Sequence, residues 1–276
     1  MAIVVNPISP VAFSVFGLPV RWYALAYIAG FLSGFYLFKY LIKRSDSQID
    51  LDKNQMDDFL TAIVLGVIIG GRLGYVLFYN LSYFIGHPLE IFALWHGGMS
   101  FHGGLLGVIV AVFLFAGYKK IAKGSKIQSA FRLLDVLTVI APIGLFFGRI
   151  ANFINMEVMG RPTNFALGVV FKGGPDYPRH PSPLYEAALE GIVLFVIMWL
   201  IYNKTNLKKY PGAMGGIFCI LYAVFRAFCE YFRQPDSHIG FLTSWGLTMG
   251  QLLSMAMFVF GTVVLYCALR KKSETI

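Results

Sequence analysis

The stretch LDVLTVIAPIGLFFGRIANFIN, residues 134–155, decides the fold that we expect for this chain. Asp135 and Arg149 are its only charged residues, and most other positions are apolar. A helix needs about 20 predominantly apolar residues to cross the hydrocarbon core of a bilayer, so a membrane-spanning helix is expected here. Its end carries Arg149, Asn152 and Asn155 at successive i, i+3 steps. This strip could hold a phosphate and neighbouring oxygens, or it could simply join helices.

The composition of the whole chain also indicates an integral membrane protein. Its 276 residues are 57% hydrophobic and 13% charged, and the mean hydropathy is +0.67, whereas soluble globular domains carry about 25% charged residues. Cys219, Cys229 and Cys267 lie in apolar stretches without the spacing of a disulfide framework or a zinc site, so we interpret them as reduced packing residues. We predict neither a metal nor a cofactor.

Hydropathy predicts seven membrane-spanning helices within a single integral membrane domain, residues 1–276. The candidate spans are residues 22–42, 59–79, 101–118, 135–154, 183–202, 214–232 and 245–269. Fifteen of the 23 Lys and Arg residues lie on alternate connections or at the adjoining helix ends. The positive-inside rule therefore places the N-terminus outside and the C-terminus in the cytoplasm. Because these residues flank helices next to an anionic leaflet, the net charge of +9 calls for no nucleic-acid partner.

The remaining basic residues are nearly all arginine. They are Arg21, Arg72, Arg149, Arg161, Lys172, Arg179, Arg226 and Arg233. Arginine has a planar, permanently charged fork that binds phosphate with two hydrogen bonds. Three of the set, Arg72, Arg149 and Arg226, lie at similar depth toward the external face of three different spans. An intramembrane arginine costs roughly 3 kcal/mol to insert, so these three imply a shared cavity, counter-charges or an anionic ligand.

Two helical patterns support this interpretation. In FRAFCEYFRQPD, residues 225–236, the positions of Arg226, Glu230 and Arg233 predict one face of the sixth helix. In GGRLGYVLFYN, residues 70–80, Arg72 shares a face with two tyrosines, which predicts either a positive, tyrosine-lined pocket or an interfacial aromatic belt. The alternative for the arginines is purely structural pairing. In that case they pair with Glu157, Glu186 or Glu230 and only hold helices together.

A histidine follows the second outer connection, in HGGMSFHGGLLGV, residues 96–108. His102 falls near the expected start of the third span, where free helix N–H groups favour anions. An unperturbed imidazole side chain titrates near pH ~6.5, so a histidine at this place is a candidate proton carrier. His96 has no comparable placement, and we interpret it as solvated or structural. Gly103 and Gly107 fit the small-residue pattern of close helix contacts.

These motifs together resemble one family. GRIANFINMEVMG, from residue 148, resembles the signature of bacterial prolipoprotein diacylglyceryl transferases, which use phosphatidylglycerol as lipid donor. The resemblance continues in order through RWYAL at 21–25, GGRLGYVLFYN at 70–80, GGMSFHGG at 97–104, RHPSPLYE at 179–186 and FRAFCEYFRQPD at 225–236. It covers essentially the whole chain. Three departures are Ala151 for a glycine, His96 for a common aspartate and Pro183 for a glutamine.

The resemblance implies a set of functional positions. They are Tyr23, Arg72, His102, Arg149, Asn152, Glu157, Gly160, Glu186, Arg226, Glu230 and Arg233. It also implies the reaction, in which the lipobox cysteine of a membrane-anchored precursor attacks phosphatidylglycerol, forms a thioether and releases glycerol phosphate. The enzyme would lie in the bacterial inner membrane with its active site toward the external face.

The implied chemistry suggests a role for each residue. Arg149 and Arg226 would stabilise the leaving phosphate, with Arg72 and Arg233 in support. His102 is the first candidate for the base that removes the thiol proton, and Tyr23 is its partner or an alternative acid or base. Phosphatidylglycerol would also contact the remaining family positions at 152, 157 and 160. The acidic side chains at 157, 186 and 230 would fix the arginines.

The connection 159–183 is the only sizeable external segment that we expect. Its Gly and Pro content predicts a turn-rich cap, with ALGVVFK as a possible short strand, although a plain long connection is the alternative. Two other functions stay open. A phospholipid or anion transporter would also carry arginines in a cavity, but no internal repeat is evident. An intramembrane hydrolase or acyltransferase would need a nucleophile and base on facing helices, and Ser100 beside His102 is a poor dyad.

Overall fold

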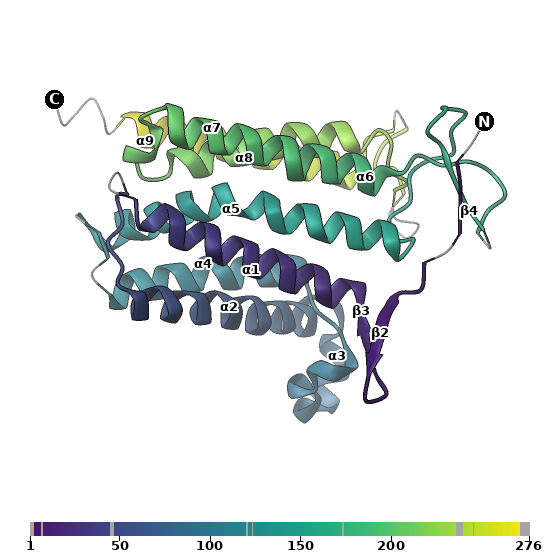
Figure 1. Cartoon of the computed structure of the whole chain (residues 1–276), viewed down its shortest axis with the longest axis horizontal. Helices are drawn as coiled ribbons and strands as arrows, with labels where there is room; N and C mark the ends of the chain where they lie inside the picture. The colour runs from purple at the N-terminus through teal and green to yellow at the C-terminus, as the bar shows by residue number, and fades with distance from the viewer. Residues whose placement is uncertain are drawn as a thin grey trace. The chain divides into compact units, whose positions relative to one another are not determined.

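A computed structural model describes residues 3–6, 8–44, 47–119, 121–122, 124–172, 174–235, 240–244 and 246–270. The chain forms two compact units, and Figure 1 labels their helices and strands. The first unit comprises Met1–Phe38 and Asp135–Ile276, and the second comprises Lys39–Leu134. Helices α1 (Trp22–Ile42) and α5 (Lys126–Ile154) continue across the division. The expectation of a single domain is untested by this division and stays a prediction.

Most other elements of the first unit are helical. Its helices are α6 Ser182–Glu186, the π-helical turn η3 Ala187–Val193, α7 Leu194–Lys204, the 3-10 turn η4 Leu207–Lys209, α8 Ala213–Cys229 and α9 Met249–Arg270. Its strands are β1 Ile3–Val5, β2 Val11–Val15, β3 Leu18–Arg21 and β4 Val169–Phe171. In the second unit lie α2 Lys53–Tyr79, α3 Leu81–Gly86, the 3-10 turns η1 Pro88–Phe92 and η2 Leu94–His96, and α4 Phe101–Tyr118.

Six helices within the described ranges are long and apolar enough to cross a membrane. They are Trp22–Ile42, Lys53–Tyr79, Phe101–Tyr118, Lys126–Ile154, Ser182–Lys204 and Met249–Arg270. The expected span at 214–232 corresponds to α8, which is apolar but has only 17 residues. The chain is therefore a mostly helical, polytopic membrane protein with six candidate spans, and a seventh crossing by α8 stays a prediction.

Helix α2 begins earlier than hydropathy predicts, because a polar cap stabilises its first turn. The Asp52 carboxylate accepts a hydrogen bond from the Gln55 N–H at 2.8 Å, and the Gln55 side chain accepts one from the Asp52 N–H at 3.0 Å. This reciprocal capping box satisfies two N–H groups that the helix itself cannot pair. The helix can therefore start at Lys53, within the charged loop.

Close backbone contact joins α2 and α4 in the second unit. A Cβ atom placed on Gly70 would lie 2.7 Å from the Gly107 Cα, and one on Gly74 would lie 2.7 Å from the Gly103 Cα. Only glycine permits helices to approach so closely. The packing interpretation of Gly103 and Gly107 is therefore confirmed, and α4 carries His102 on this closely packed pair.

A buried carboxylate joins α5 to the start of α8 in the first unit. Asp135 is 3% exposed, and its two oxygens accept hydrogen bonds from the N–H groups of Gly212 at 2.7 Å and Gly215 at 2.8 Å. Gly212 precedes α8 at φ +94° and has no side chain to cap it. Asp135 therefore caps α8 from a neighbouring helix, where the free N–H groups favour a negative charge.

Replacing Asp135 by asparagine should lower the stability of the protein in detergent. An amide has one oxygen, so one of the two buried N–H groups would lose its acceptor, at a cost of about 1–3 kcal/mol. Thermal unfolding of the purified variant measures the loss. Asp52→Asn is the matched control, because the exposed cap of α2 tolerates asparagine as well as aspartate. Equal unfolding temperatures for the two variants would contradict the buried cap.

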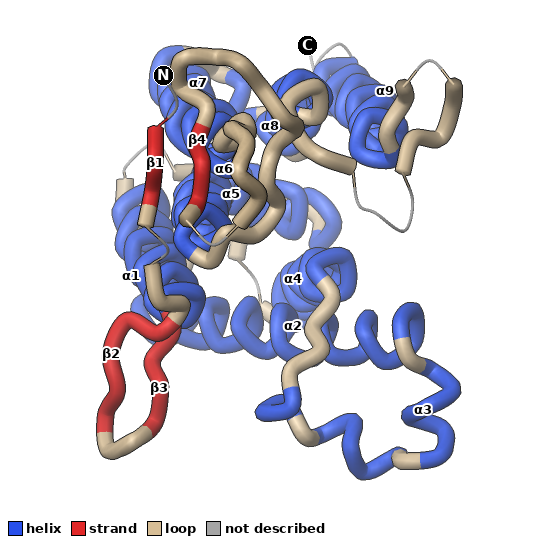
Figure 2. The backbone as a smooth tube through the Cα atoms, turned by 90° about the vertical axis from the view of Figure 1, so that its right-hand side faces the viewer, coloured by secondary structure: helices blue, strands red, loops and turns tan. Residues whose placement is uncertain are grey.

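The cap expected at 159–183 contains the predicted strand. β4 lies within ALGVVFK and pairs in parallel with β1, so that Ile3 faces Val169 (Figure 2). Val169 also exchanges two backbone hydrogen bonds with Arg179, at 2.9 and 3.0 Å. A separate antiparallel hairpin of β2 and β3 precedes α1, with Phe16 and Gly17 at positive φ in its turn. No pattern noted in the sequence predicted this hairpin.

Candidate functional site

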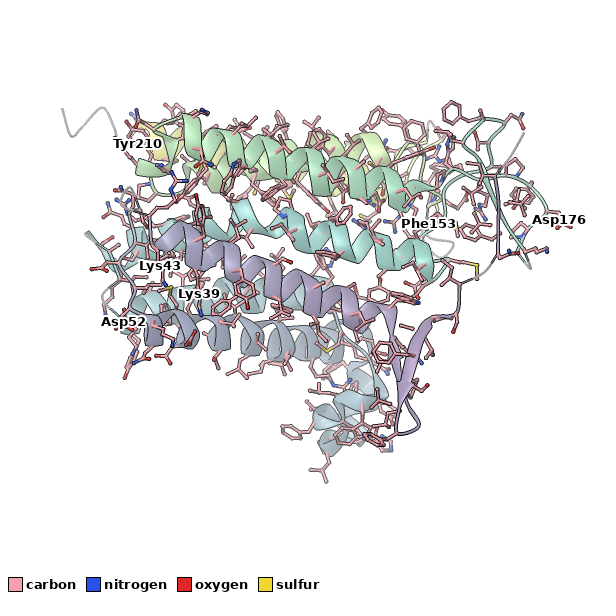
Figure 3. All side chains as sticks on the ribbon, in the orientation of Figure 1. Lys39, Lys43, Asp52, Phe153, Asp176 and Tyr210 are labelled. Carbon is pink, nitrogen blue, oxygen red and sulfur yellow. The ribbon has the colours of Figure 1, made fainter. Side chains whose placement is uncertain are left out.

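The first unit contains a buried cluster of three arginines and three glutamates. Glu186 is the common partner: its carboxylate lies 3.0 Å from Arg149 Nη1, 2.6 Å from Arg226 Nη1 and 3.8 Å from Arg233 Nη1. Arg149 lies on α5, Glu186 on α6 and Arg226 on α8. Arg149 is one helical turn from Phe153, which lies at the same end of this unit as Asp176 of the cap and far from Tyr210 (Figure 3). The cluster thus lies at the cap end of the helices.

Glu190 is a member of the cluster that the sequence analysis missed. Its Oε2 atom lies 3.0 Å from Arg149 Nη2, and its Oε1 atom lies 3.7 Å from Arg226 Nη1. It follows Glu186 by one i, i+4 step in RHPSPLYEAALEG, so helical spacing alone could have indicated it. Glu190 belongs to the π-helical turn η3. Such turns are rare and occur frequently at functional sites.

Arg233 reaches the cluster from a turn. We expected it on the same helix as Arg226, which was wrong because α8 ends at Cys229 and Glu230 caps it. The Glu230 Oε1 atom pairs with Arg226 Nη2 and lies 3.8 Å from Arg233 Nε. Arg161 also secures this turn, donating from Nε to the Arg233 carbonyl at 2.9 Å. The turn therefore fixes Arg233 through backbone contacts.

The arginine side chains of the cluster are more exposed than its glutamate side chains. The side chains of Arg149, Arg226 and Arg233 are 17%, 13% and 16% exposed, whereas those of Glu186 and Glu190 are 0% exposed and that of Glu230 is 5% exposed. Burying charges is costly unless they are paired, and here each arginine has at least two glutamate contacts. A molecule that reaches the cluster therefore meets cations first, on a support of buried anions.

A second group of polar residues lies at the end of α5. The hydroxyl of Tyr23, in the first turn of α1, donates a hydrogen bond to Asn152 Oδ1. The structure thus brings together two predicted site residues that are 129 positions apart. Asn152 is buried, at 8% exposure, and lies one turn from Arg149. Glu157 is exposed and accepts a hydrogen bond from Asn155 at 3.4 Å. The carboxylates that pair with the arginines of the cluster are those of Glu186, Glu190 and Glu230.

The turn after α5 is strained. Val158 has φ +57°, a conformation that a β-branched residue rarely adopts. Ser182 holds it in place by donating a hydrogen bond to the Val158 carbonyl at 2.9 Å. Such strain occurs mostly where the surrounding structure needs a particular chain path. Here the path leads from Asn152 to Gly160.

Gly160 lies where the cap meets the turn after α8, and it forms an isolated antiparallel bridge with Arg233. Its N–H donates to the His180 carbonyl at 3.1 Å, and a Cβ atom here would lie 2.7 Å from the Phe232 carbonyl oxygen. The His180 ring contacts Tyr185 and Phe232, at centroid distances of 5.9 and 5.1 Å. This burial lowers the pKa of His180 below its ordinary range. Gly160 therefore has a clear packing role, and its contact with phosphatidylglycerol stays a prediction.

Arg72 and His102 belong to the second unit. The Arg72 guanidinium donates to the carbonyl oxygens of residues 90, 91, 93, 97 and 98, at 2.5–3.2 Å. These bonds engage all of its N–H groups and shape the loop before α4. His102 is exposed in the first turn of α4, after the capping residue Ser100. Its placement near a helix start is confirmed, whereas phosphate binding by Arg72 stays a prediction.

The prolipoprotein diacylglyceryl transferase family matches residues 10–267 of this chain. The chain belongs to this family. A curated relative from Rhodospirillum rubrum, named phosphatidylglycerol–prolipoprotein diacylglyceryl transferase, is 48% identical over 266 residues, which cover 96% of this chain and 94% of the relative. Relatives of the same name from Methylocella silvestris and Nitrobacter hamburgensis are 46% and 49% identical, covering 96% and 94% of this chain and 96% and 88% of their own lengths. The resemblance inferred from the sequence motifs is therefore confirmed.

Two of the three family departures, Ala151 and Pro183, lie next to cluster residues in the sequence of this transferase-family chain. Ala151 is 1% exposed in α5, between Arg149 and Asn152. Pro183 is buried in the first turn of α6, where a proline costs no helical hydrogen bond. Nothing is described of the side chain of His96. No group of three or more metal-binding side chains occurs among the residues that the structure covers.

Proposed function

We propose that this chain transfers the diacylglyceryl group of phosphatidylglycerol to the lipobox cysteine of prolipoproteins. In this reaction a carbon–sulfur bond forms at the glyceryl carbon and the carbon–oxygen bond to phosphate breaks. The bonding electrons leave with glycerol phosphate, and the thiol proton passes to a base. Family membership and the names of the relatives support the proposal. The observation that carries the chemistry is the cluster whose accessible groups are arginines and whose buried groups are glutamates.

The arginines supply what the leaving group needs. Negative charge grows on the phosphate oxygen as the bond breaks, and rigid cations in a dry site stabilise that charge more than they stabilise the starting diester. We assign this role to Arg149 and Arg226, which the buried carboxylates hold in place, with Arg233 in support. Asn152, oriented by Tyr23, would hold the head group. Glu157 and Gly160, beyond the end of α5, are the remaining proposed contacts with phosphatidylglycerol.

The base is proposed from side-chain chemistry. A thiol has a pKa of about 8.5 when unperturbed, so it must lose its proton to become an effective nucleophile. The imidazole of His102 is the proposed acceptor, and the Tyr23 hydroxyl is the alternative acid or base. Arg72 is proposed as a further contact with the lipid, in addition to its hydrogen bonds to the loop at residues 90–98.

The same proposal includes an arrangement in the membrane. Seven spans, with α8 as the shortest, would leave the N-terminus and the cap at residues 159–183 outside and the C-terminus in the cytoplasm. The alternating lysines and six candidate spans support this. The cluster at the cap end of the first unit would then face the external side of the bacterial inner membrane, where prolipoproteins are exposed.

The test uses the purified chain in detergent with phosphatidylglycerol and a lipobox peptide. We expect release of glycerol phosphate together with a gain in peptide mass equal to one diacylglyceryl group. A peptide with serine in place of cysteine is the matched control and should give neither. His102→Gln should be slow, and a full-rate variant would remove the base assignment. Lipid binding without a thioether product, in folded protein, would favour a transporter instead.

A further inference from the structure

Thr248, which directly precedes α9, contacts the cluster. This residue is 2% exposed, and its hydroxyl donates a hydrogen bond to Glu230 Oε2 at 2.7 Å. The Thr248 hydroxyl oxygen also accepts a hydrogen bond from the Gln251 N–H at 3.2 Å, and the Gln251 side chain accepts one from the Thr248 N–H at 3.1 Å. A hydroxyl has one proton to donate, and here that proton goes to Glu230. Thr248 therefore caps α9 and holds a carboxylate of the cluster at once.

Gly250 provides the space for that carboxylate. A Cβ atom at this position would lie 2.6 Å from Glu230 Oε1 and 2.8 Å from Oε2. Any side chain would therefore push Glu230 away from the start of α9. The start of a 22-residue helix also favours a negative charge. The start of α9 thus binds one carboxylate: the Thr248 hydroxyl donates to it, and Gly250 leaves room for it.

We propose that Thr248 and Gly250 are positioning residues of the transferase. They fix Glu230, and Glu230 orients the guanidinium groups of Arg226 and Arg233. Neither residue reaches the reacting atoms; both act through the carboxylate. The proposal rests on the proposed function, because its consequence is measured in transfer to the thiol.

The experiment compares Thr248→Val, Thr248→Ser and Gln251→Ala in the full-length chain, with kcat and KM for the lipobox peptide. Gln251→Ala is the matched control, because it removes one hydrogen bond of the same helix cap, from the Thr248 N–H to the Gln251 side chain, but leaves the bond to Glu230. We expect Thr248→Val to lower kcat/KM by about tenfold or more, since it removes a hydrogen bond to a charged group. Thr248→Ser and Gln251→Ala should stay within about twofold of the unaltered enzyme. Equal losses in Thr248→Val and Gln251→Ala would overturn the proposal.

A double-mutant cycle shows whether Thr248 acts through the carboxylate. In a Glu230→Gln background, Thr248→Val should have little further effect, because the partner of its hydroxyl is already altered. Losses that simply multiply would instead indicate independent roles and would overturn the proposal. If Thr248→Val does not fold, Gly250→Ala leaves the Thr248–Gln251 cap intact and gives the same comparison. Unchanged kcat/KM in Gly250→Ala would then decide against a positioning role.

Failure of the proposed function would give a different pattern. In that case even the unaltered chain yields no thioether, and the variants are compared by phosphatidylglycerol binding in detergent micelles. Weaker binding by Thr248→Val than by Gln251→Ala would sustain the positioning role. Equal binding would overturn it without reference to turnover.

Discussion

Arg149→Met should abolish transfer, and adding Glu190→Gln should restore folding without restoring activity. In the single variant Glu190 keeps its charge while losing two contacts with Arg149, at 3.0 and 3.3 Å. Breaking a buried ion pair costs about 3–5 kcal/mol, because one charge is left uncompensated. The double variant removes both charges, so most of that stability should return. Transfer should stay at least about a hundredfold below the original rate, since a cation at the leaving phosphate is still missing.

Thermal unfolding and peptide modification, measured on the same preparations, separate the two effects. Lys39→Met is the matched control, because its pair with Asp57 is at the surface, with side chains 28% and 51% exposed. Surface pairs of this kind contribute only about 0–1 kcal/mol. Recovery of both stability and transfer in the double variant would show that Arg149 serves only to join helices. That was the structural alternative for the intramembrane arginines.

The sequence predicted the glutamates that pair with the arginines better than the residue that holds Glu230 in place. Arg226 and Glu230 are one helical step apart, and the presence of Glu186 in an apolar span required a counter-charge, so pairing could be expected. Glu190 could also have been found from its spacing to Glu186. Thr248 could not, because its bond to Glu230 depends on the path of the chain between α8 and α9. No short-range pattern encodes that path.

Hydropathy predicted some helix ends correctly and missed others. Hydropathy predicted α1 and α4 to the residue, at 22–42 and 101–118. It missed the early start of α2, because the capping box at Asp52 and Gln55 is polar and contributes nothing to an apolar window. It also extended the sixth helix to 232, because the aromatic residues after Cys229 are apolar although the chain turns there. Polar caps and turns set helix ends, and they need to be read separately from hydropathy.

Arg72 has structural contacts that its residue type alone does not predict. Its depth in an apolar span predicted a phosphate ligand, which stays a prediction, and its guanidinium lies 5.1 Å from the Phe84 ring and donates to backbone carbonyls. Two of those carbonyls belong to Gly97 and Gly98, which adopt φ values of +79° and +80°. Such a chain path follows from glycine conformations that no hydropathy window reports.

Arg72→Lys should therefore loosen the loop at residues 90–98 about as much as Arg72→Ala. The arginine makes five hydrogen bonds to that loop, at 2.5–3.2 Å, through three nitrogens in a rigid fork. A lysine has three donors on one nitrogen and cannot span the same carbonyls. Each hydrogen bond to a charged group contributes about 1.5–3 kcal/mol, so losing two should speed local opening more than about a hundredfold. Hydrogen exchange of peptides covering 90–98, in detergent, measures this directly.

The two roles proposed for Arg72 give opposite results with lysine. If Arg72 only binds phosphate, lysine should partly replace it, because lysine keeps the positive charge. The 90–98 loop would then keep its protection from exchange even in Arg72→Ala. A residue that shapes the loop would not be replaced, because the five carbonyls require the geometry of the fork rather than its charge. Peptides from α4 beyond Gly107 serve as the internal control, since the five hydrogen bonds of Arg72 end on residues 90–98 and not on that part of α4. Loss of protection confined to residues 90–98 in both variants would show that Arg72 holds the loop that precedes α4 and His102.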